Sequence, residues 1–304
     1  MALKDWLGPM RGPFLLLTPA CMALAIVLAW LSAEHPGSAW GWRALLALIG
    51  ALSAHISVNA LNEYADFRSG LDQQTQRTPF SGGSGTLPAN PALASTALWT
   101  GLISLTLTGA IGLGFLASWP GAALELAPLG LIGLMLIVAY TPWVTRRPWV
   151  CLMAPGLGFG PLMIVGTQLA LNGHATPMAW LSSLVPFFLV NNLLLLNQFP
   201  DVEADRAVGR VTLPILLGKP ASARILGLQW LTAYAGLLVM VLTGAAPVGA
   251  ALGLSSLPLA WASWQGVRRH MDDIPALLPA MGMNVGVCLL TPVLMAVGLT
   301  WVAR

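Results

Sequence analysis

The sequence is poor in charge. Only 8% of its 304 residues are Asp, Glu, Lys or Arg, whereas 57% are hydrophobic, and the mean hydropathy is +0.76. A soluble domain carries roughly 25% charged residues, because a surface that faces water has to be covered by groups that water solvates. The deficit excludes an ordinary soluble protein and indicates that lipid is the solvent for much of the surface.

Cysteine is also scarce. Cys21, Cys151 and Cys288 lie far apart, and each falls within an apolar segment. An odd number without a spacing pattern excludes a disulfide framework and a cysteine metal site, so we predict three small buried side chains. The net charge of +3 comes from residues in short segments between apolar runs. Charges placed in this way set the orientation of the protein in the membrane. They do not form a basic surface for nucleic acid, so no nucleic-acid partner is expected.

Long apolar runs are what the sequence has in abundance. A bilayer core needs about 20 apolar residues per helix. The first run is itself long enough to span, and the twelve residues before it hold too little apolar length for a cleaved signal. We predict an all-α bundle of about nine transmembrane helices in a single integral membrane domain, residues 1–304. The runs are Pro13–Ser32, Trp40–Asn62, Pro91–Trp119, Leu126–Pro142, Val150–Asn172, Met178–Phe199, Ala221–Gly244, Pro247–Gln265 and Leu277–Val302.

The charged residues support this count. With a cytoplasmic N-terminus, only Arg43 and Arg304 among the basic residues fall outside, as the positive-inside rule requires. Among the acidic residues, only Glu34 and Glu125 fall outside. Acidic residues contribute little to topology, so their distribution indicates a function at the cytoplasmic face. The inner basic residues are Lys4, Arg11, Arg68, Arg77, Arg146, Arg147, Arg206, Arg210, Lys219, Arg224, Arg268 and Arg269.

Two polar clusters interrupt the apolar pattern. Residues 62–72 read Asn-Glu-Tyr-Ala-Asp-Phe-Arg-Ser-Gly-Leu-Asp and end the second run, and residues 197–205 read Asn-Gln-Phe-Pro-Asp-Val-Glu-Ala-Asp and end the sixth. Residues four apart share one face of a helix. Two stripes of oxygen-bearing side chains follow, one with Asn62 and Asp66, continued by His55 and Asn59, and one with Asn197, Asp201 and Asp205.

Stacked carboxylates of this kind repel one another unless a cation lies between them. Oxygen ligands without Cys or His alongside suit Mg2+, which is commonly held by one or two carboxylates together with substrate phosphates. Solvated helix ends would explain a single Asp. Two matched clusters favour a site, because polar groups at membrane depth are costly and usually face an interior cavity.

These clusters resemble motifs of the UbiA superfamily of membrane prenyltransferases. Members carry Asn-Asp-x-x-Asp with a further Asp on helix two, and Asp-x-x-x-Asp on helix six. Residues 209–218, Gly-Arg-Val-Thr-Leu-Pro-Ile-Leu-Leu-Gly, are similar to a third family segment, Gly-Lys-x-Thr-Leu-x-x-x-Leu-Gly. The resemblance spans most of the chain. It departs at Glu63, where Asp is usual, and at Pro200, where many relatives carry a basic residue.

The resemblance implies Mg2+-dependent transfer of a prenyl group from a prenyl diphosphate to an aromatic acceptor. It implies an integral protein of a bacterial cytoplasmic (inner) membrane with the active site facing the cytoplasm. The glycine-rich loop at 78–85 is a further place for phosphate, through its backbone amides. The residues implied are Asp66, Asp72, Asp201 and Asp205 as metal ligands, Asp66, Asp201 and Tyr140 as catalytic residues, and Asn62, Arg68, Arg77, Arg146, Arg147, Asn197 and Arg210 around the diphosphate.

The acceptor is narrowed by residues 159–161, Phe-Gly-Pro, and 166–167, Gly-Thr, which are similar to the menaquinone-forming branch. That likeness implies 1,4-dihydroxy-2-naphthoate. Another quinone precursor, a chlorophyll-type ring and a glycerol-phosphate lipid remain open. Outside the family, a cation-coupled transporter and a structural membrane subunit are the alternatives, but transporter ion sites lie near the bilayer midplane. Asn284 is either an acceptor-side residue or an interhelical hydrogen-bonding group.

Overall fold

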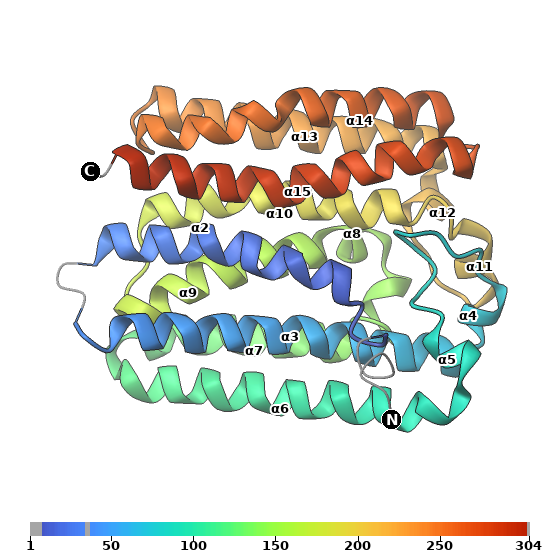
Figure 1. The fold of residues 1–304 in the computed structure, drawn as a ribbon, viewed down its shortest axis with the longest axis horizontal. Helices are drawn as coiled ribbons and strands as arrows, with labels where there is room; N and C mark the ends of the chain where they lie inside the picture. Colours follow the sequence, from blue (N-terminus) through green and yellow to red (C-terminus); the bar gives the residue numbers. More distant parts are fainter. Residues whose placement is uncertain (1–7, 34–36, 303–304) are drawn as a thin grey trace.

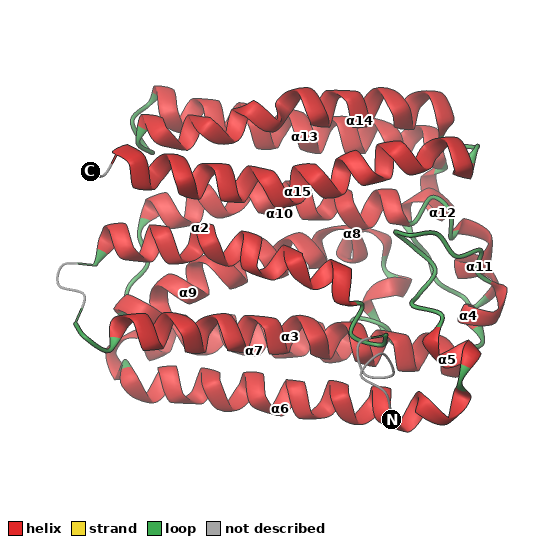
Figure 2. Ribbon diagram, in the orientation of Figure 1, coloured by secondary structure: helices red, strands yellow, loops and turns green. Residues whose placement is uncertain are grey.

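The computed structural model describes residues 8–33 and 37–302, so Lys4, Glu34 and Arg304 of the charge pattern lie outside the described residues. Within these two ranges every element is a helix, the helices are joined by turns and loops, and there is no strand. The long helices lie side by side along one axis (Figures 1 and 2). The predicted all-α architecture is therefore confirmed.

Eight segments are long and apolar enough to cross a membrane, and several combine a helix with a short turn that leads into it. The spans are Gly12–Ser32, Trp40–Ser69, Pro91–Ser118, Pro120–Ala139, Pro148–Asn172, Pro177–Asn197, Lys219–Leu242 and Ile274–Trp301. Their helices are α2 (Leu17–Ser32), α3 (Trp40–Ser69), α6 (Ala94–Ser118), α7 (Ala123–Ala139), α8 (Pro148–Leu157), α9 (Met163–Asn172), α10 (Pro177–Asn197), α13 (Lys219–Leu242) and α15 (Ile274–Val302). The short helices between them are α4 (Leu71–Gln74), α5 (Thr86–Ala89), α11 (Val202–Ala207) and α12 (Leu213–Leu217).

A ninth pass is built differently from the others. A 3-10 segment, Val248–Ser256, leads into α14 (Leu257–His270). At 2.0 Å per residue for the first and 1.5 Å for the second, the two together extend about 39 Å, enough to cross a bilayer core. They pack along α15 from Gly298, which lies against the backbone of Gly249, to Ala280, whose carbonyl accepts from Ser263 Oγ at 2.7 Å. This segment corresponds to the predicted run at 247–265.

The ends of the bundle agree with an odd number of passes. In Figure 1, α2 begins at the end that carries α4, α5, α11 and α12, and α15 finishes at the opposite end. Both polar clusters therefore lie at one end of the described bundle, together with most of the basic residues. Arg43 lies at the other end, over the ring of Trp119 at 5.3 Å. A cytoplasmic N-terminus stays a prediction.

Two helix boundaries differ from those predicted, and both matter for the site. α3 continues past Asn62 to Ser69, where Gly70 ends it with a positive φ of 78°. In the fifth pass a π-helical turn, Gly158–Leu162, interrupts the α-helix between α8 and α9; Pro155 precedes the turn and Pro161 lies within it. Proline removes a helical hydrogen bond, and π turns occur frequently at functional sites. Phe159 in this turn lies edge-on to His55, with ring centroids 4.9 Å apart.

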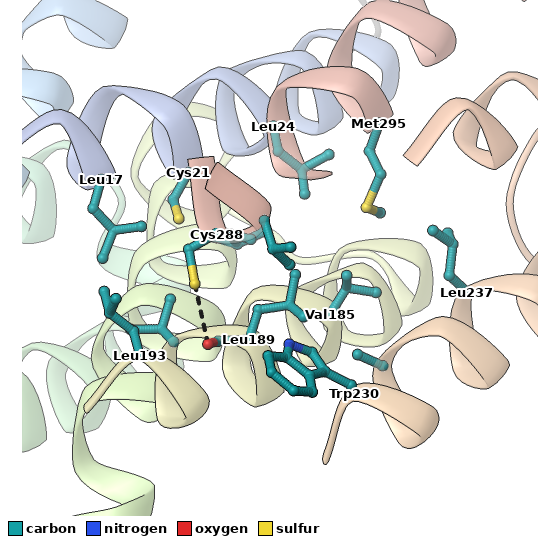
Figure 3. Close-up of a cluster of buried hydrophobic side chains, with 14 of the residues drawn as sticks. Leu17, Cys21, Leu24, Val185, Leu189, Leu193, Trp230, Leu237, Cys288 and Met295 are labelled. Atoms are coloured by element: carbon teal, nitrogen blue, oxygen red, sulfur yellow. Dashed lines mark hydrogen bonds between the residues drawn. The ribbon is translucent and has the colours of Figure 1, made fainter. Parts of the chain in front are cut away.

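The main cluster of buried hydrophobic side chains draws on α2, α10, α13 and α15. Figure 3 shows part of this core, where Cys288 Sγ donates to the carbonyl of Leu189 at 3.2 Å. All three cysteines are buried and free of disulfides, as predicted. Asn284 Nδ2 donates to the carbonyl of Asn192 at 3.1 Å, and Gln229 Nε2 donates to Asn192 Oδ1 at 2.8 Å. Asn284 is therefore an interhelical hydrogen-bonding group.

Candidate active site

A cavity of about 670 Å3 runs between α3, α6, α7, α8–α9 and α10. Most of its wall is apolar, and α7 forms its thinnest part, since none of the described residues 123–139 is fully buried. The end nearest the short helices is polar. The residues of both sequence clusters that line this end are Asn62, Asp66, Asp72, Asn197, Asp201 and Asp205, joined by Arg11, Tyr140 and Arg210.

The first cluster is positioned by the last turns of α3. Asn62 Nδ2 donates to Thr141 Oγ1 at 2.9 Å, which ties α3 to the connection after α7. One turn later, Asp66 is buried and pairs with Arg210. Gly70 then reverses the chain, because its left-handed φ is open to glycine at no steric cost. As a result α4 brings Asp72 to the wall of the same cavity.

Glu63 lies behind this wall rather than in it. Its carboxylate is fully buried and accepts from Arg11 Nε at 3.1 Å and from the backbone N–H of Ser84 at 2.9 Å. The hydroxyl of Ser84 donates to it as well. The residue that departs from the family pattern thus joins three segments: α3, the approach to α2, and the glycine-rich loop.

The glycine-rich loop folds against the carboxylates through its backbone. Thr78 Oγ1 accepts from the N–H groups of Phe80 and Ser81 at 3.1 and 2.9 Å and fixes the turn. Gly83 follows with a φ of +73°, and a Cβ there would lie 2.9 Å from Asp72 Oδ1. Only glycine permits both this backbone conformation and this close approach. Gly82 and Gly83 consequently line the polar end of the cavity.

The second cluster is not one continuous helical stripe. α10 ends at Asn197, and a turn at 198–201 separates it from α11. The backbone N–H of Asp205 donates to the carbonyl of Asp201 at 2.8 Å, so the helical direction resumes at once. Asn197, Asp201 and Asp205 therefore all still reach the cavity. Arg210 donates to Asp205 Oδ1 at 3.0 Å and also pairs with Asp66, and so bridges the two clusters.

The polar end has too few positive charges for its carboxylates. Burial, followed by the carboxylates of Glu63 and Asp66, raises the pKa of Asp72 to about 7. Burial and the neighbouring Asp205 likewise raise the pKa of Asp201 to about 7. Burial also raises the pKa of Asp205, against the opposing effect of Arg210. Among the described residues that line the cavity, four carboxylates face two guanidinium groups, those of Arg11 and Arg210.

Two carboxylate oxygens at the polar end are free to accept a hydrogen bond or to bind a cation. Asp72 Oδ2 and Asp201 Oδ1 are buried and accept no hydrogen bond from any residue that the structure describes. Such orphaned acceptors are costly unless a ligand satisfies them. Over residues 8–33 and 37–302, no three acidic, His or Cys side chains already converge on one point. That arrangement fits Mg2+, which takes one or two carboxylates and completes its shell with phosphate and water.

Tyr140 lies beside these groups at the end of α7 and lines the cavity. Burial is the main cause that raises the pKa of its phenol, and the nearby Cys151 makes a smaller contribution in the same direction. The hydroxyl is therefore protonated at neutral pH and is available as a hydrogen-bond donor.

Four of the predicted diphosphate ligands lie outside the lining formed by the described residues. Arg68 and Arg146 are exposed, and exposed Arg147 stacks over Trp143 at 5.1 Å. Arg77 is exposed and reaches back only to the backbone carbonyl of Asp72, at 3.5 Å. Roles for these four residues stay predictions.

Arg11 is a site residue that the sequence pattern did not single out, except as a topology charge. It precedes the first apolar run and has no motif around it. It adopts a left-handed backbone conformation with φ 51°, unusual for a residue other than glycine. Asn59 Nδ2 donates to the carbonyl of Met10 at 3.0 Å and helps to hold this segment over the cavity. Burial lowers the pKa of Arg11, but the surrounding carboxylates outweigh it and raise the pKa.

Comparisons with known proteins agree with this geometry. The model of the UbiA prenyltransferase family matches residues 17–286. The chain is 28% identical to a 1,4-dihydroxy-2-naphthoate octaprenyltransferase of Escherichia coli (strain K12), over 97% of this chain and 95% of that protein. It is also 28% identical to the Bacillus subtilis (strain 168) protein of the same name, over 66% of this chain and 63% of that protein.

A similar fold occurs in the structure of a UbiA homolog from Archaeoglobus fulgidus bound to DMAPP and Mg2+. The TM-score is 0.59 at 14% identity, over 94% of this chain and 99% of that one. Over the described residues, a bundle of membrane-spanning helices carries carboxylates and arginines at one end of an apolar cavity, and together with these relatives it defines an integral membrane enzyme of isoprenoid chemistry. The chain belongs to the UbiA prenyltransferase family, and its enzymatic class is prenyltransferase.

Proposed function

We propose that the protein transfers a polyprenyl group from a polyprenyl diphosphate to 1,4-dihydroxy-2-naphthoate, with Mg2+, as a step of menaquinone formation. The single observation that carries the proposal is the cavity of about 670 Å3, with orphaned carboxylate oxygens at its polar end and an apolar wall beyond. A diphosphate with its metal matches the first part, and an isoprenoid chain matches the second. The names of the curated relatives support the naphthoate acceptor.

Asp72 and Asp201 are the residues best placed to hold the metal, since each keeps a buried oxygen without a partner among the described residues. Asp66 and Asp205 stand beside them, each shared with Arg210. When bound, Mg2+ would supply positive charge that favours departure of the diphosphate. In this proposal Asp72 and Asp201 would hold the ion, and Asp66 and Asp205, the other two carboxylates predicted from the sequence, would stand beside it.

The arginines add fixed positive charge at the same end. Arg210 and Arg11 line the cavity and carry raised pKa values, since nearby carboxylates outweigh the burial that lowers them. Guanidinium groups suit phosphate through paired N–H donors. They are oriented before the substrate arrives, so they stabilise the charge that develops on the leaving diphosphate without reorganising. Tyr140 contributes a protonated hydroxyl at the same place.

The apolar wall protects the reaction from water. When the allylic C–O bond breaks, diphosphate leaves, and the prenyl carbocation has to meet the aromatic carbon before a water molecule does. The new C–C bond replaces the bond from that carbon to its carboxylate, which leaves as carbon dioxide. His55 and Phe159 line the cavity where its polar end gives way to the apolar part. His55 Nδ1 is hydrogen-bonded to Thr18 Oγ1 at 2.9 Å, which fixes the ring. This position is suited to an aromatic acceptor.

The proposal is tested with purified protein in detergent, radiolabelled geranylgeranyl diphosphate and a panel of aromatic acceptors. A lipid-soluble product with 1,4-dihydroxy-2-naphthoate that disappears with EDTA is the expected result. Product with a different acceptor only would overturn the naphthoate assignment and keep prenyl transfer. No product with any acceptor, together with no Mg2+-dependent binding of the diphosphate, would overturn prenyl transfer itself.

A further inference from the structure

Among the glycines that line the cavity, four lie on α6 and α7, beside its apolar part. Gly109 and Gly112 belong to α6, and Gly130 and Gly133 belong to α7. A Cβ placed at Gly112 or Gly130 would have no neighbouring atom within 4 Å. At Gly109 and Gly133 the nearest atoms would be leucine methyl carbons at 4.0 and 3.9 Å. These glycines leave open space beside them.

Some other helical glycines of the bundle differ, because their Cβ positions are already occupied by neighbouring atoms. A Cβ at Gly101 would lie 2.6 Å from the side chain of Leu61, and one at Gly160 would lie 2.5 Å from the carbonyl of Ser183. In those places only glycine allows the helices to approach. Glycine inside a helix is less favourable than alanine. Close helix packing does not require glycine at the four cavity positions. What these glycines do is leave volume open in the cavity.

The four glycines form two layers. α6 leads away from the polar end and α7 returns to it, and the Cβ position of Gly109 adjoins Leu134, next to Gly133. At 1.5 Å per residue, Gly133 lies about 10 Å from Tyr140 along α7, and Gly130 lies about 15 Å away. Gly112 is one turn deeper than Gly109. The near layer is therefore Gly109 with Gly133, and the deep layer is Gly112 with Gly130.

An independent observation marks this cavity as a ligand site. Asp72, which is 3% exposed, lines its polar end and keeps Oδ2 without a partner among the described residues. A ligand whose head group and bound cation satisfy that oxygen would place its remaining part along the apolar wall. The glycine layers lie where that part has to extend.

We propose that the two glycine layers determine the length of prenyl chain that the protein accepts. This inference rests on the proposed function, because it takes a prenyl diphosphate as the ligand. A side chain in the near layer would stop the chain early, and one in the deep layer would stop only longer chains. A Cβ at these four positions meets no backbone atom of another helix within 4 Å, so we expect the effect to fall on the ligand and not on helix packing.

The test compares Gly133→Leu, in the near layer, with Gly112→Leu, in the deep layer. Gly114→Leu is the matched control, because Gly114 lies two residues farther along α6, is exposed, has no atom within 4 Å of its Cβ position and lies outside the cavity lining. Mg2+-dependent binding of geranyl, geranylgeranyl and octaprenyl diphosphate is measured for each variant. Binding is measured apart from turnover, so the choice of acceptor does not affect the comparison.

For Gly133→Leu, octaprenyl diphosphate should lose about 10- to 200-fold in affinity relative to geranyl diphosphate, the range by which misfitted carbon atoms alter apolar pockets. Gly112→Leu should discriminate against octaprenyl diphosphate and spare geranylgeranyl diphosphate more than Gly133→Leu does. Gly114→Leu should leave both ratios within about threefold of the wild type. Gly133→Ala, which adds a single carbon, should shift the ratio in the same direction by less.

Retained binding of geranyl diphosphate shows that a variant is folded. If the wild type binds all three donors and neither Gly133→Leu nor Gly133→Ala changes the ratio, the inference is wrong while the proposed function stands. If the wild type binds no prenyl diphosphate, both fall together.

Discussion

The two carboxylate clusters look alike in sequence but differ in how their side chains are held. In the first cluster, Glu63 is fully buried and bound by Arg11 and Ser84, and Asp66 is paired with Arg210. In the second, Asp201 keeps a buried oxygen with no partner from the described chain. Asp205 shares Arg210 with Asp66. The difference therefore lies between individual carboxylates: Glu63, Asp66 and Asp205 have partners within the protein, whereas Asp201 keeps an oxygen without one among the described residues.

This difference separates structural carboxylates from those available to a ligand. A buried carboxylate with its hydrogen bonds complete holds segments together, whereas one with an orphaned oxygen raises the free energy of the empty protein until something binds. Asp72 belongs with Asp201 in this respect, although it lies at the end of the first cluster. Arg210 connects the two clusters, because it pairs with Asp66 of the first and Asp205 of the second.

The largest effect is expected for Asp201→Asn. The amide keeps the shape of the side chain but loses the charge that a metal and a departing diphosphate require, so kcat should fall by at least about 100-fold. Stability should be unchanged or higher, since a buried and poorly compensated carboxylate is removed. Steady-state kinetics and thermal unfolding in detergent check the two statements.

Glu203→Gln is the matched control for this variant. Glu203 lies in the same cluster, but its side chain is 82% exposed and pairs with Arg206 at the surface. Its activity should stay close to that of the wild type. Comparable losses in both variants would show that any charge removed near α11 impairs the enzyme, and the distinction between the two carboxylates would be lost.

Arg210→Lys should have the next largest effect. Lysine keeps the positive charge but lacks the fork that donates to Asp66 and Asp205 at once. We expect kcat/KM to fall about 10- to 100-fold and the unfolding temperature to drop, because one buried carboxylate loses its partner. Arg206→Lys, at the exposed pair with Glu203, should change neither quantity appreciably. A fully active Arg210→Lys would mean that charge alone matters here.

Much of the fold and part of the site follow from the sequence for clear physical reasons. The apolar runs predict the passes because lipid demands about 20 apolar residues from each helix. Helical spacing predicts that Asn62 and Asp66 share a face, and they do line one cavity. Asn197, Asp201 and Asp205 reach it too, although the helix is interrupted between the first two.

The remaining features depend on contacts between distant segments. Arg11 meets Glu63 across 52 positions, and Arg210 meets Asp66 across 144. Neither arginine carries a local pattern that names its partner. The role of the glycines in α6 and α7 cannot be predicted from the sequence either. A glycine that leaves space and a glycine that allows close packing have the same letter in the sequence. Only the positions of neighbouring side chains distinguish Gly112 from Gly101.

A smaller, pH-dependent effect follows from the two orphaned carboxylates. In the metal-free protein the pKa values of Asp72 and Asp201 are raised to about 7, mainly by burial. The folded state then holds protons more tightly than the unfolded state, so this contribution to stability is present at low pH and is lost as pH rises through about 7. Metal-free protein should unfold at a higher temperature at about pH 6 than at about pH 8.

Mg2+ should have the opposite pH dependence, because it competes with those protons. Its affinity should weaken about tenfold between about pH 8 and about pH 6 if one proton is displaced on binding. Titrations with Mg2+, followed by thermal unfolding at both values, measure the change. In Asp201→Asn the pH dependence should become shallower. An affinity independent of pH in the wild type would mean that neither carboxylate takes part in binding.

Glu63→Gln should give the smallest effect and the sharpest contrast between the clusters. Glu63 stands where the family pattern has a metal-binding Asp, yet in this structure its oxygens are occupied by Arg11 and Ser84 and lie outside the cavity lining. The glutamine should loosen the glycine-rich loop and raise KM for the diphosphate about fivefold, the equivalent of one weakened hydrogen bond of about 1 kcal/mol. Mg2+ affinity should not change. Ser84→Ala, which removes only the hydroxyl donor, should raise KM less. A marked loss of Mg2+ affinity in Glu63→Gln would instead assign Glu63 to the metal, and would mean that the longer side chain leaves Arg11 and Ser84 when the substrate binds.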